Sequence, residues 1–369
     1  MPKGEPNSRL ETNRTSLHQT QSDPTLMLHI GLDLSRRRLD VCVCDATGAM
    51  IDEFVTAPDA DGLRVLAGRF SVPVRAVVES MTGARFVHDT LEELGWAVEV
   101  ADAQKVKALA PLTAKTDRID ARVLADLSFR DLIPAIWLPP PGVRGMRELG
   151  RFRLHLVKHR TALKNRIHST LITHGRSVPV SDLFGVTGRQ LLEDLELSRA
   201  WAESTRMTLE VIDHLDTQIG GLNAQLLQAG VERPDVELLQ TAPGIGPVLG
   251  FTIASEIGDI SRFASPSKLV GYTGLCPRVI QSGETDRRGP LTKHGPRWLR
   301  WALIEATIHA ARHRVYRDRH QHTIRRLGKQ RGPKVARVDT ARRLTKAIWW
   351  MLTRNEGFAP GGSGPPLAA

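Results

Sequence analysis

The stretch "LMLHIGLDLSRRRLDVCVCDATG", residues 26–48, decides the fold of the N-terminal part of the chain. Its two apolar, β-rich runs, residues 26–35 and 38–48, predict a β-hairpin. Further strands are predicted at "MIDEFVTA" (50–57), "VRAVVES" (74–80) and "AVEVAD" (97–102), with helices at residues 62–70 and 85–94. This alternation predicts an α/β domain with a mixed sheet over residues 28–140.

Length and charge limit what the rest of the chain can be. A chain of 369 residues accommodates two domains and a connector. The net charge of +11 indicates a polyanionic partner, either nucleic acid or an acidic membrane surface. The sequence has no apolar run of membrane-spanning length and no export signal, and its three cysteines are too few for a disulfide framework. We therefore expect a cytoplasmic protein associated with the bacterial nucleoid.

The remaining segments predict a helical C-terminal half. Residues 1–27 and 355–369 have the composition of disordered termini, and "WLPPPGVRG" (137–145) closes the first domain. Residues 141–235 predict a connector of two long amphipathic helices, packed as an antiparallel hairpin or as a coiled coil between two chains. Their apolar positions are Leu149, Phe152, Leu156, Leu163, Ile167 and Leu171, then Leu209, Ile212, Leu215, Ile219, Leu222 and Leu226. Residues 236–354 are predicted to be helical with glycine-rich breaks.

Basic residues concentrate in two places. Residues 278–346 hold 19 Arg and Lys against 5 Asp and Glu. The first connector helix is basic along most of its length, with only Glu148 opposing Arg144, Arg147, Arg151, Arg153, Lys158, Arg160, Lys164, Arg166 and Arg176. Such helices are suited to phosphate contacts, although a solvated charged face is the simpler interpretation.

Four carboxylates form a candidate metal site. Asp33 lies within an apolar strand, Glu79 ends the fourth strand, and Asp117 and Asp120 are spaced to share one face of a helix. Each has an ordinary alternative as a turn residue, a helix cap or a partner of the helix dipole. Together they are the ligands that two-metal phosphoryl transfer requires, and a carboxylate within a half-buried strand is costly without a function.

The segments "GLDLSRRRLDV", "VVESMTG" and "AKTDRIDARVLA" resemble the DEDD motif of one family of insertion-sequence transposases. This is the insertion-sequence one-ten family, which includes the Piv and MooV DNA invertases. The resemblance extends from residue 28 to about residue 352. It implies that the N-terminal domain is RNase H-like (RuvC-like) and that Asp33, Glu79, Asp117 and Asp120 bind Mg²⁺ or Mn²⁺. "SRRRLD" is more arginine-rich than the Ser-Lys expected there, which could alter nucleic-acid contacts.

The C-terminal half contains two further motifs. "LLQTAPGIGPVLGFTIASEIGDISRF" (238–263) predicts a helix-hairpin-helix in which Gly244 and Gly246 approach a phosphate, or else a simple Gly/Pro helix break. "SKLVGYTGLCPRVIQSGETDRRGPLTKHGPRWLRWAL" (267–303) resembles the C-terminal domain of the same family, which implies that Ser282 is the nucleophile. Nucleic-acid contacts are predicted for Arg151, Lys158, Lys164, Arg278, Arg287, Arg288, Lys293, Arg297 and Arg300.

The resemblance implies a transposase that acts on donor and target DNA. Members of the family are expected to be guided by a noncoding RNA and to assemble their composite site between protomers, which implies a homodimer or homotetramer. Three alternatives are a RuvC-like nuclease or junction resolvase without serine chemistry, an actin-like sugar kinase and a non-catalytic nucleic-acid binder. The kinase is disfavoured because Ser35 and three arginines stand where that fold needs a glycine-rich phosphate loop.

Overall fold

The structure is a computed structural model that describes residues 27–109, 116–177, 179–282 and 285–359. Contacts between residues divide the chain into two compact units, residues 1–138 and 139–369. The boundary lies within the proline-rich segment at residues 137–145. The second unit contains both the long helices and the C-terminal region, and their separation into a connector and a further domain stays a prediction.

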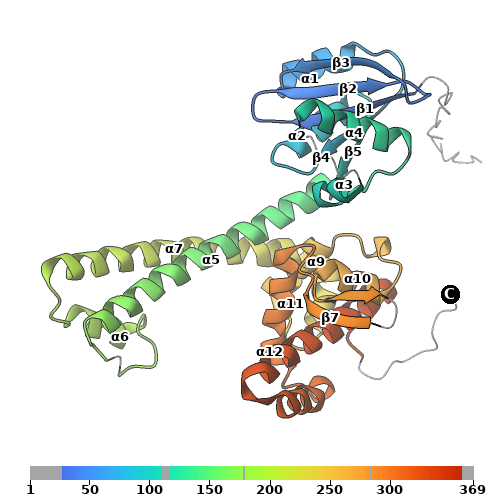
Figure 1. Cartoon of the computed structure of the whole chain (residues 1–369). Coiled ribbons are helices and arrows are strands. Elements are labelled where there is room, and N and C mark those ends of the chain that lie inside the picture. The colour runs from blue at the N-terminus through green and yellow to red at the C-terminus, as the bar shows by residue number, and fades with distance from the viewer. Residues whose placement is uncertain (1–26, 110–115, 178, 283–284, 360–369) are drawn as a thin grey trace, which may run out of the picture. The chain divides into compact units, whose positions relative to one another are not determined.

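A five-stranded mixed sheet forms the first unit, as the hydrophobic pattern predicted (Figure 1). The strands follow the order β3-β2-β1-β4-β5, with β1 antiparallel to β2 and parallel to β4. Their bounds are β1 Leu28–Leu34, β2 Leu39–Cys44, β3 Met50–Thr56, β4 Val74–Glu79 and β5 Ala97–Ala101. The helices of this unit are α1 Ala60–Gly68, α2 Ala84–Glu93, α3 Ala103–Leu109 and α4 Asp117–Phe129.

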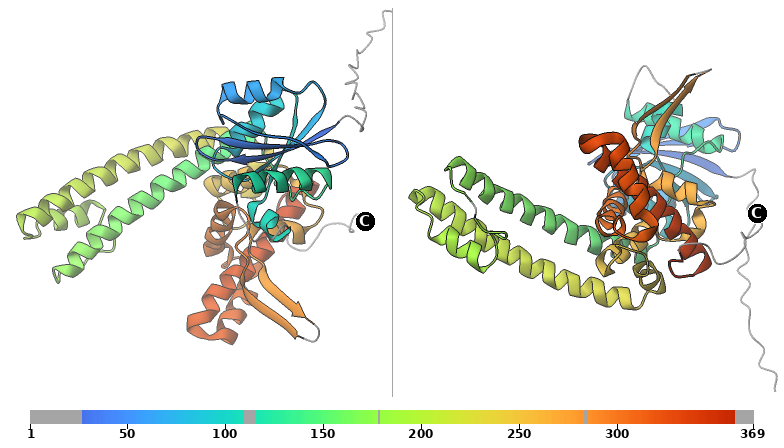
Figure 2. Two further views of the ribbon diagram at one scale, coloured as in Figure 1. Left: turned by 45° about the horizontal axis from the view of Figure 1, so that its top comes forward. Right: turned by 90° about the horizontal axis from the view of Figure 1, so that it is seen from below.

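The two faces of the sheet are covered differently. Ile30 and Leu32 face a core that includes Leu63 and Leu66 of α1. Because side chains alternate along a strand, Gly31 and Asp33 point to the opposite face, which α4 covers. The left view of Figure 2 shows the strands between α1 and α4.

Gly31 allows α4 to lie directly on β1. A Cβ atom at this position would lie 1.9 Å from the carbonyl oxygen of Ala121 and 2.5 Å from the amide nitrogen of Ala125. Real Cβ atoms do not approach backbone atoms this closely, so a larger residue would push α4 off the sheet. The residue between Ile30 and Leu32 therefore determines how closely the helix bearing Asp117 and Asp120 approaches.

Two long helices, α5 Pro141–Thr173 and α7 Arg199–Val231, pack against each other within one chain. They run antiparallel, since Arg153 bonds to Asn223 and Arg166 to Ser204, and the connecting segment contains α6 Val186–Glu193 (Figures 1 and 2). The hairpin is thus the arrangement found in the single chain. Within α5 the predicted apolar position Phe152 is exposed, and Leu154 is buried instead.

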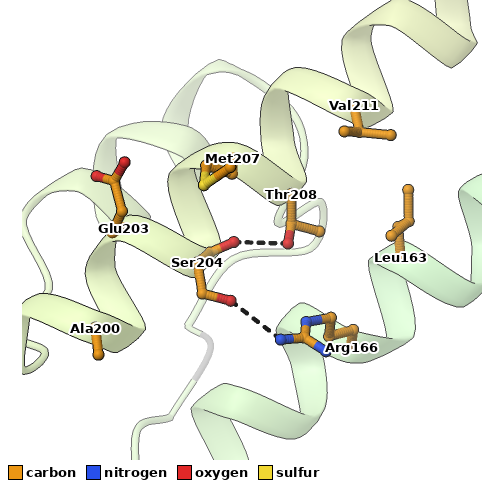
Figure 3. Close-up of a pocket in the computed structure, with 8 residues that line it drawn as sticks. All are labelled: Leu163, Arg166, Ala200, Glu203, Ser204, Met207, Thr208 and Val211. Carbon is orange, nitrogen blue, oxygen red and sulfur yellow. Dashed lines mark hydrogen bonds between the residues drawn. The ribbon is translucent and has the colours of Figure 1, made fainter.

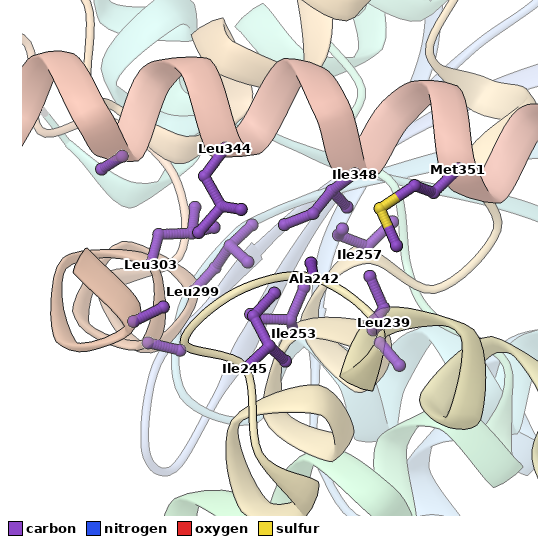
Figure 4. Close-up of a cluster of buried hydrophobic side chains, with 14 of the residues drawn as sticks. Leu239, Ala242, Ile245, Ile253, Ile257, Leu299, Leu303, Leu344, Ile348 and Met351 are labelled. Atoms are coloured by element: carbon purple, nitrogen blue, oxygen red, sulfur yellow. The ribbon is translucent and has the colours of Figure 1, made fainter. Parts of the chain in front are cut away.

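The rest of the second unit is mostly helical, as predicted, around one apolar core (Figure 4). Residues from α8, α9, α11 and α12 meet there, among them Leu239, Ile253, Leu303 and Ile348. The elements are α8 Pro234–Gln240, α9 Pro247–Ile257, a short 3-10 helix Ile260–Arg262, α10 Pro266–Thr273, β6 Pro277–Ser282, β7 Thr285–Leu291, α11 Arg297–Ala310 and α12 Arg314–Arg354.

Three features of the second unit differ from the sequence expectation. The antiparallel hairpin of β6 and β7 interrupts a region expected to have only helices and turns. The helix α12 breaks at Gly328, whose φ of 75° is non-helical, so that Arg319 lies beside Asp339. Phe358, expected in a disordered tail, donates its amide to Thr241 Oγ1 at 2.8 Å and packs beside Tyr316.

Some predictions fall outside the part of the chain that the structure describes. These are the expected disorder of residues 1–26 and 360–369. Within the described residues, no helix combines the length and the apolar character that crossing a membrane requires.

Candidate active site

A row of three acidic residues crosses the α4-facing side of the sheet. Asp33 near the end of β1 is the direct register partner of Asp40 on β2. On the other side, β1 and β4 are paired up to Leu32 and Val78, and Asp33 and Glu79 are the residues that follow. Residues opposite each other on neighbouring strands place their side chains on the same face. The sheet therefore carries Asp40, Asp33 and Glu79 side by side, and this set is called the acidic row below.

The first turn of α4 brings two further acids to this side of the sheet. Thr116 caps the helix, and its Oγ1 accepts the amide hydrogen of Ile119 at 3.4 Å. Asp117 and Asp120 both lie in the first turn, where a negative charge also interacts favourably with the helix dipole. Since α4 packs on β1 at Gly31, the start of the helix lies toward the acidic row.

The electrostatics of Asp33 show that these acids interact. Burial raises the pKa of Asp33 to about 7, and the negative charges of Asp120, Asp117, Glu79 and Asp40 contribute to the rise in that order. A carboxyl group surrounded by like charges holds its proton more tightly because ionisation adds to the repulsion. The other three acids predicted from the sequence thus act on Asp33, together with a fourth neighbour, Asp40.

This donor set suits a hard divalent cation. Carboxylate oxygens are the ligands that Mg²⁺ and Mn²⁺ prefer, and a bound cation would relieve the repulsion that raises the pKa of Asp33. The residues that could hold it are Asp33, Glu79, Asp117 and Asp120. Among the described residues, however, no three His, Cys, Asp or Glu side chains are gathered closely enough to form a ready ligand cluster. Binding would therefore require these side chains to move together.

Asp40 is the acidic residue that the sequence analysis missed. Its side chain is 2% exposed and accepts a hydrogen bond from Arg38 Nε at 2.7 Å. The sequence could have indicated Asp40, because this residue interrupts the apolar run of its strand just as Asp33 does. Their direct pairing depends on the length of the turn between β1 and β2, which places Asp33 opposite Asp40.

Ser282 belongs to the second unit. It lies exposed at the end of β6, paired through the backbone with Thr285 of β7. Arg278 and Arg287 are exposed on the same hairpin, and Arg288 is part of β7. The hydroxyl of Ser282 is therefore carried by a basic β-hairpin.

The two glycines of the predicted helix-hairpin-helix have different environments. They lie in the turn between α8 and α9. At Gly244, which has a φ of +85°, a Cβ would lie 2.2 Å from the carbonyl oxygen of Ala306, so this glycine permits close packing on α11. At Gly246, the N-cap of α9, a Cβ would meet open space. Only Gly246 is placed for a backbone approach by a phosphate.

Several of the predicted nucleic-acid contacts carry exposed positive charge. Lys293 and Arg297 are exposed, and the Arg297 guanidinium lies 4.5 Å from the ring centre of Trp298. Lys158 of α5 lies over the same ring at 4.3 Å, and Lys164 lies 4.5 Å from the ring of Phe184. Arg300 instead donates to the carbonyl oxygen of Thr273 at 3.1 Å.

Two arginines of α5 have structural partners that the sequence did not indicate. Arg147, expected on the exposed basic face, is buried and donates to the carbonyl oxygens of Ser255 and Glu256 at 2.8 and 2.6 Å. Arg151 donates to both carboxylate oxygens of Glu256, at 2.6 and 2.8 Å. The expectation for Arg147 was wrong because the start of α5 packs on α9 rather than facing solvent.

A pocket between α5 and α7 of the second unit has one acidic lining residue, Glu203, and therefore contains no acidic cluster (Figure 3). Arg166 donates to Ser204 Oγ at 3.1 Å within it. Its lining residues are Leu163, Arg166, Ala200, Glu203, Ser204, Met207, Thr208 and Val211. With a single carboxylate in its lining, this pocket lacks the ligands for a divalent cation, and the acids of the first unit remain the candidate site.

Comparisons with known proteins show similarity to transposases. A family model described as "Transposase IS116/IS110/IS902 family" matches residues 236–323, and a model of DEDD transposases of the IS110 type, described as "Transposase", matches residues 30–174. The transposase for insertion sequence element IS1111A of Coxiella burnetii is 26% identical over 344 residues, which cover 90% of this chain and 91% of that protein. The transposase for insertion sequence element IS1328 of Yersinia enterocolitica is 24% identical over 294 residues, which cover 78% of this chain and 86% of that protein.

Proposed function

Because this chain belongs to the IS116/IS110/IS902 family of transposases, we propose that it excises its own insertion sequence and inserts it at a specific DNA site. The observation that carries this proposal is that the charges of Glu79, Asp117 and Asp120 act on Asp33 and add to the rise of its pKa. Such a group is unfavourable for the metal-free protein and is suited to holding divalent cations at a phosphodiester.

In the proposed mechanism, the four acids hold Mg²⁺ or Mn²⁺ beside the DNA strand. The chemistry that the bound ions supply is activation of the attacking oxygen and stabilisation of the leaving oxygen. Asp33 must lose its proton to act as a ligand, and its pKa of about 7 means that it does so near neutral pH. The end of β4 positions the carboxylate of Glu79, and the first turn of α4 positions those of Asp117 and Asp120.

The proposed nucleophile is Ser282. Its Oγ would attack the phosphorus atom and lose its proton to solvent, while the bond from phosphorus to a deoxyribose oxygen breaks. That oxygen would take a proton from solvent and leave as a hydroxyl, and the other DNA end would stay joined to Ser282 through the phosphate. The exposed position of Ser282 on a basic hairpin supports this role, because Arg278 and Arg287 can neutralise the phosphate charge. The role itself comes from the family resemblance.

The remaining parts of the proposal concern partners. Exposed basic side chains at Lys158, Lys293 and Arg297 would contact the backbones of donor and target DNA. The turn at Gly246, between α8 and α9, would be the hairpin of a helix-hairpin-helix. A noncoding guide RNA and a dimeric or tetrameric assembly follow from the family resemblance. The RNase H-like identity of the sheet has the same origin, supported by the mixed strand order.

A test separates this proposal from a metal-dependent nuclease that lacks serine chemistry. The assay uses the full-length chain, its element with flanking DNA, RNA transcribed from the element, and Mg²⁺. We expect Asp33→Asn and Ser282→Ala each to abolish strand joining, and only the wild type to form a covalent protein–DNA product after denaturation. Full strand cleavage by Ser282→Ala would support the nuclease, and joining by Asp33→Asn would exclude any catalytic role for the acids.

A further inference from the structure

Arg38 is a positively charged residue next to the acidic row. It pairs with Asp40 through two hydrogen bonds, from Nε to Oδ2 at 2.7 Å and from Nη2 to Oδ1. The two partners differ in exposure, since the Asp40 side chain is 2% exposed and the Arg38 side chain is 46% exposed. The buried carboxylate thus holds a guanidinium whose outer side faces solvent.

The backbone of Arg38 is also held in place. Ser35 Oγ donates to the carbonyl oxygen of Arg38 at 2.9 Å, and the amide of Arg38 donates back to Ser35 Oγ at 3.2 Å. The amide of Ser35 donates to the same carbonyl oxygen at 2.9 Å. The turn between β1 and β2 therefore fixes Arg38 at both its main chain and its side chain, which lowers the entropy cost of binding a ligand there.

The charges around Arg38 connect it with the candidate metal site. The hydrogen bond to Asp40 raises the pKa of Arg38, and the negative charges of Asp117 and Asp33 add to the rise. The guanidinium is therefore close enough to interact with acids from both the sheet and α4. A phosphate group that approached the acids would meet this cation too.

We propose that Arg38, held by the buried Asp40, binds a phosphate of the DNA strand on which Asp33, Glu79, Asp117 and Asp120 act. An arginine has five N–H donors in a planar fork, and the pair with Asp40 occupies two of them. The remaining three can donate to phosphate oxygens from the solvent-facing side. This inference rests on the proposed function, and it gives the arginine-rich "SRRRLD" turn a specific role.

A pair that served only to stabilise the β1–β2 hairpin would have different consequences. Such a pair would act by holding β1 and β2 in position, so its loss would lower the affinity for the metal ion and the affinity for DNA together. If Arg38 instead binds a phosphate, neutralising both partners of the pair should weaken DNA binding and leave metal binding unchanged. Replacing both partners, as in Arg38→Gln with Asp40→Asn, removes one positive and one negative charge and leaves no unpaired buried carboxylate.

The experiment compares two binding constants of the full-length chain. Mn²⁺ binding is measured by titration calorimetry without nucleic acid. Binding of a duplex that carries the terminal sequence of the element is measured in Ca²⁺, which is used so that cleavage does not interfere. The variants are the double variant Arg38→Gln/Asp40→Asn and the single variant Arg38→Lys. The matched control is Arg64→Gln/Asp61→Asn, an exposed ion pair on α1, which covers the other face of the sheet.

We expect the double variant to bind the duplex roughly tenfold more weakly, since one charge-assisted hydrogen-bonding group is lost. Its Mn²⁺ affinity should stay within about twofold of the wild type because the net charge near the acids is unchanged. Arg38→Lys should weaken duplex binding by a smaller factor, about threefold, since lysine keeps the charge but lacks the fork. The control should change neither constant.

Three outcomes would overturn the inference. Duplex binding by the double variant equal to that of the control would mean that Arg38 contacts no phosphate. A parallel loss of Mn²⁺ and duplex affinity would assign the pair to hairpin geometry. If the wild type bound no Mn²⁺, or if Asp33→Asn bound it equally well, the proposed metal site would fail and the inference with it. The first two results leave the proposed function standing.

Discussion

Asp33 and Asp40 are register partners on antiparallel strands β1 and β2, and both point toward α4. Like charges directly opposite each other in a sheet are destabilising. Asp40 is neutralised by Arg38, whereas Asp33 keeps a pKa of about 7. Asp40 is thus held in an ion pair, whereas Asp33 can lose its proton near neutral pH when a cation binds.

The pKa of Asp33 predicts how stability depends on pH in metal-free protein. The folded-state value of about 7 lies above the ordinary 3.8, so this group contributes stability below about pH 4 that is lost as the pH rises through 7. After allowing for solvent screening, we expect a loss of roughly 1–2 kcal/mol in the free energy of unfolding between about pH 5 and pH 8. Urea unfolding in EDTA measures this loss.

The variant Asp33→Asn should remove that part of the pH dependence and be more stable than the wild type near pH 8. Asp61→Asn on α1 is the control and should keep the wild-type dependence, because Asp61 is highly exposed and pairs only with Arg64 in the structure described. Equal pH slopes for the wild type and Asp33→Asn would show that Asp33 ionises normally.

The close approach of α4 to β1 predicts a large effect of Gly31→Ala. The new methyl group would overlap the carbonyl oxygen of Ala121, so either α4 moves or the domain loses stability. We expect a destabilisation of at least about 3 kcal/mol and faster hydrogen exchange in α4. Thermal unfolding and amide exchange by mass spectrometry provide the measurements.

Gly68→Ala is the matched control, because a Cβ at Gly68 in α1 would meet no atom within 4 Å. Alanine is favoured over glycine in a helix, so this variant should be unchanged or up to about 1 kcal/mol more stable. If Gly31→Ala behaved like Gly68→Ala, α4 could not lie on the sheet as described.

The buried ion pair between α5 and α9 predicts that Glu256 anchors the long helix. Its carboxylate is 1% exposed and accepts two hydrogen bonds from Arg151. We expect Glu256→Gln to lower the free energy of unfolding by roughly 2–4 kcal/mol, since partly buried Arg151 loses its charged partner. Glu203→Gln in the exposed pair with Arg206 should change it by less than about 0.5 kcal/mol. Similar values for the two variants would contradict the anchoring role.

The exposed arginines of the β6–β7 hairpin predict a change in the salt dependence of DNA binding. If Arg278 contacts one phosphate, Arg278→Gln should reduce the slope of log affinity against log salt concentration by about 0.9. Arg206→Gln on α7 should leave the slope unchanged, since Arg206 is paired with Glu203 and Glu210. Fluorescence anisotropy with a labelled duplex measures both. An unchanged slope for Arg278→Gln would remove Arg278 from the interface.

The hydrophobic pattern was sufficient for most elements of the first unit, although it did not predict α3. All five strands and the helices that correspond to α1 and α2 were predicted within a few residues, because alternation and helical periodicity are local properties. The β6–β7 hairpin was missed because polar residues and glycines dominate it, and its strands are exposed. The break at Gly328 was missed because a single glycine within a helical pattern is often tolerated.

The candidate site was predictable to the extent that a carboxylate in an apolar strand is unusual. Asp33 was predicted in this way, Glu79 from its place at the end of a strand, and Asp117 and Asp120 from their spacing on one face of a helix. The effect of the last three on the pKa of Asp33 supports the grouping. Asp40 carried the same signal but was not recognised. Whether Ser282 acts with these acids is still a prediction.

The sequence alone determined which segments of the first unit form its five strands, the acids along them and the basic character of the C-terminal half. Each of these depends on neighbouring residues and on composition. Only the tertiary structure decided that Asp33 faces Asp40, that Gly31 admits α4, and that Arg147 is buried instead of exposed. The physical reason is that register and burial depend on contacts between segments far apart in the chain, which local patterns do not contain.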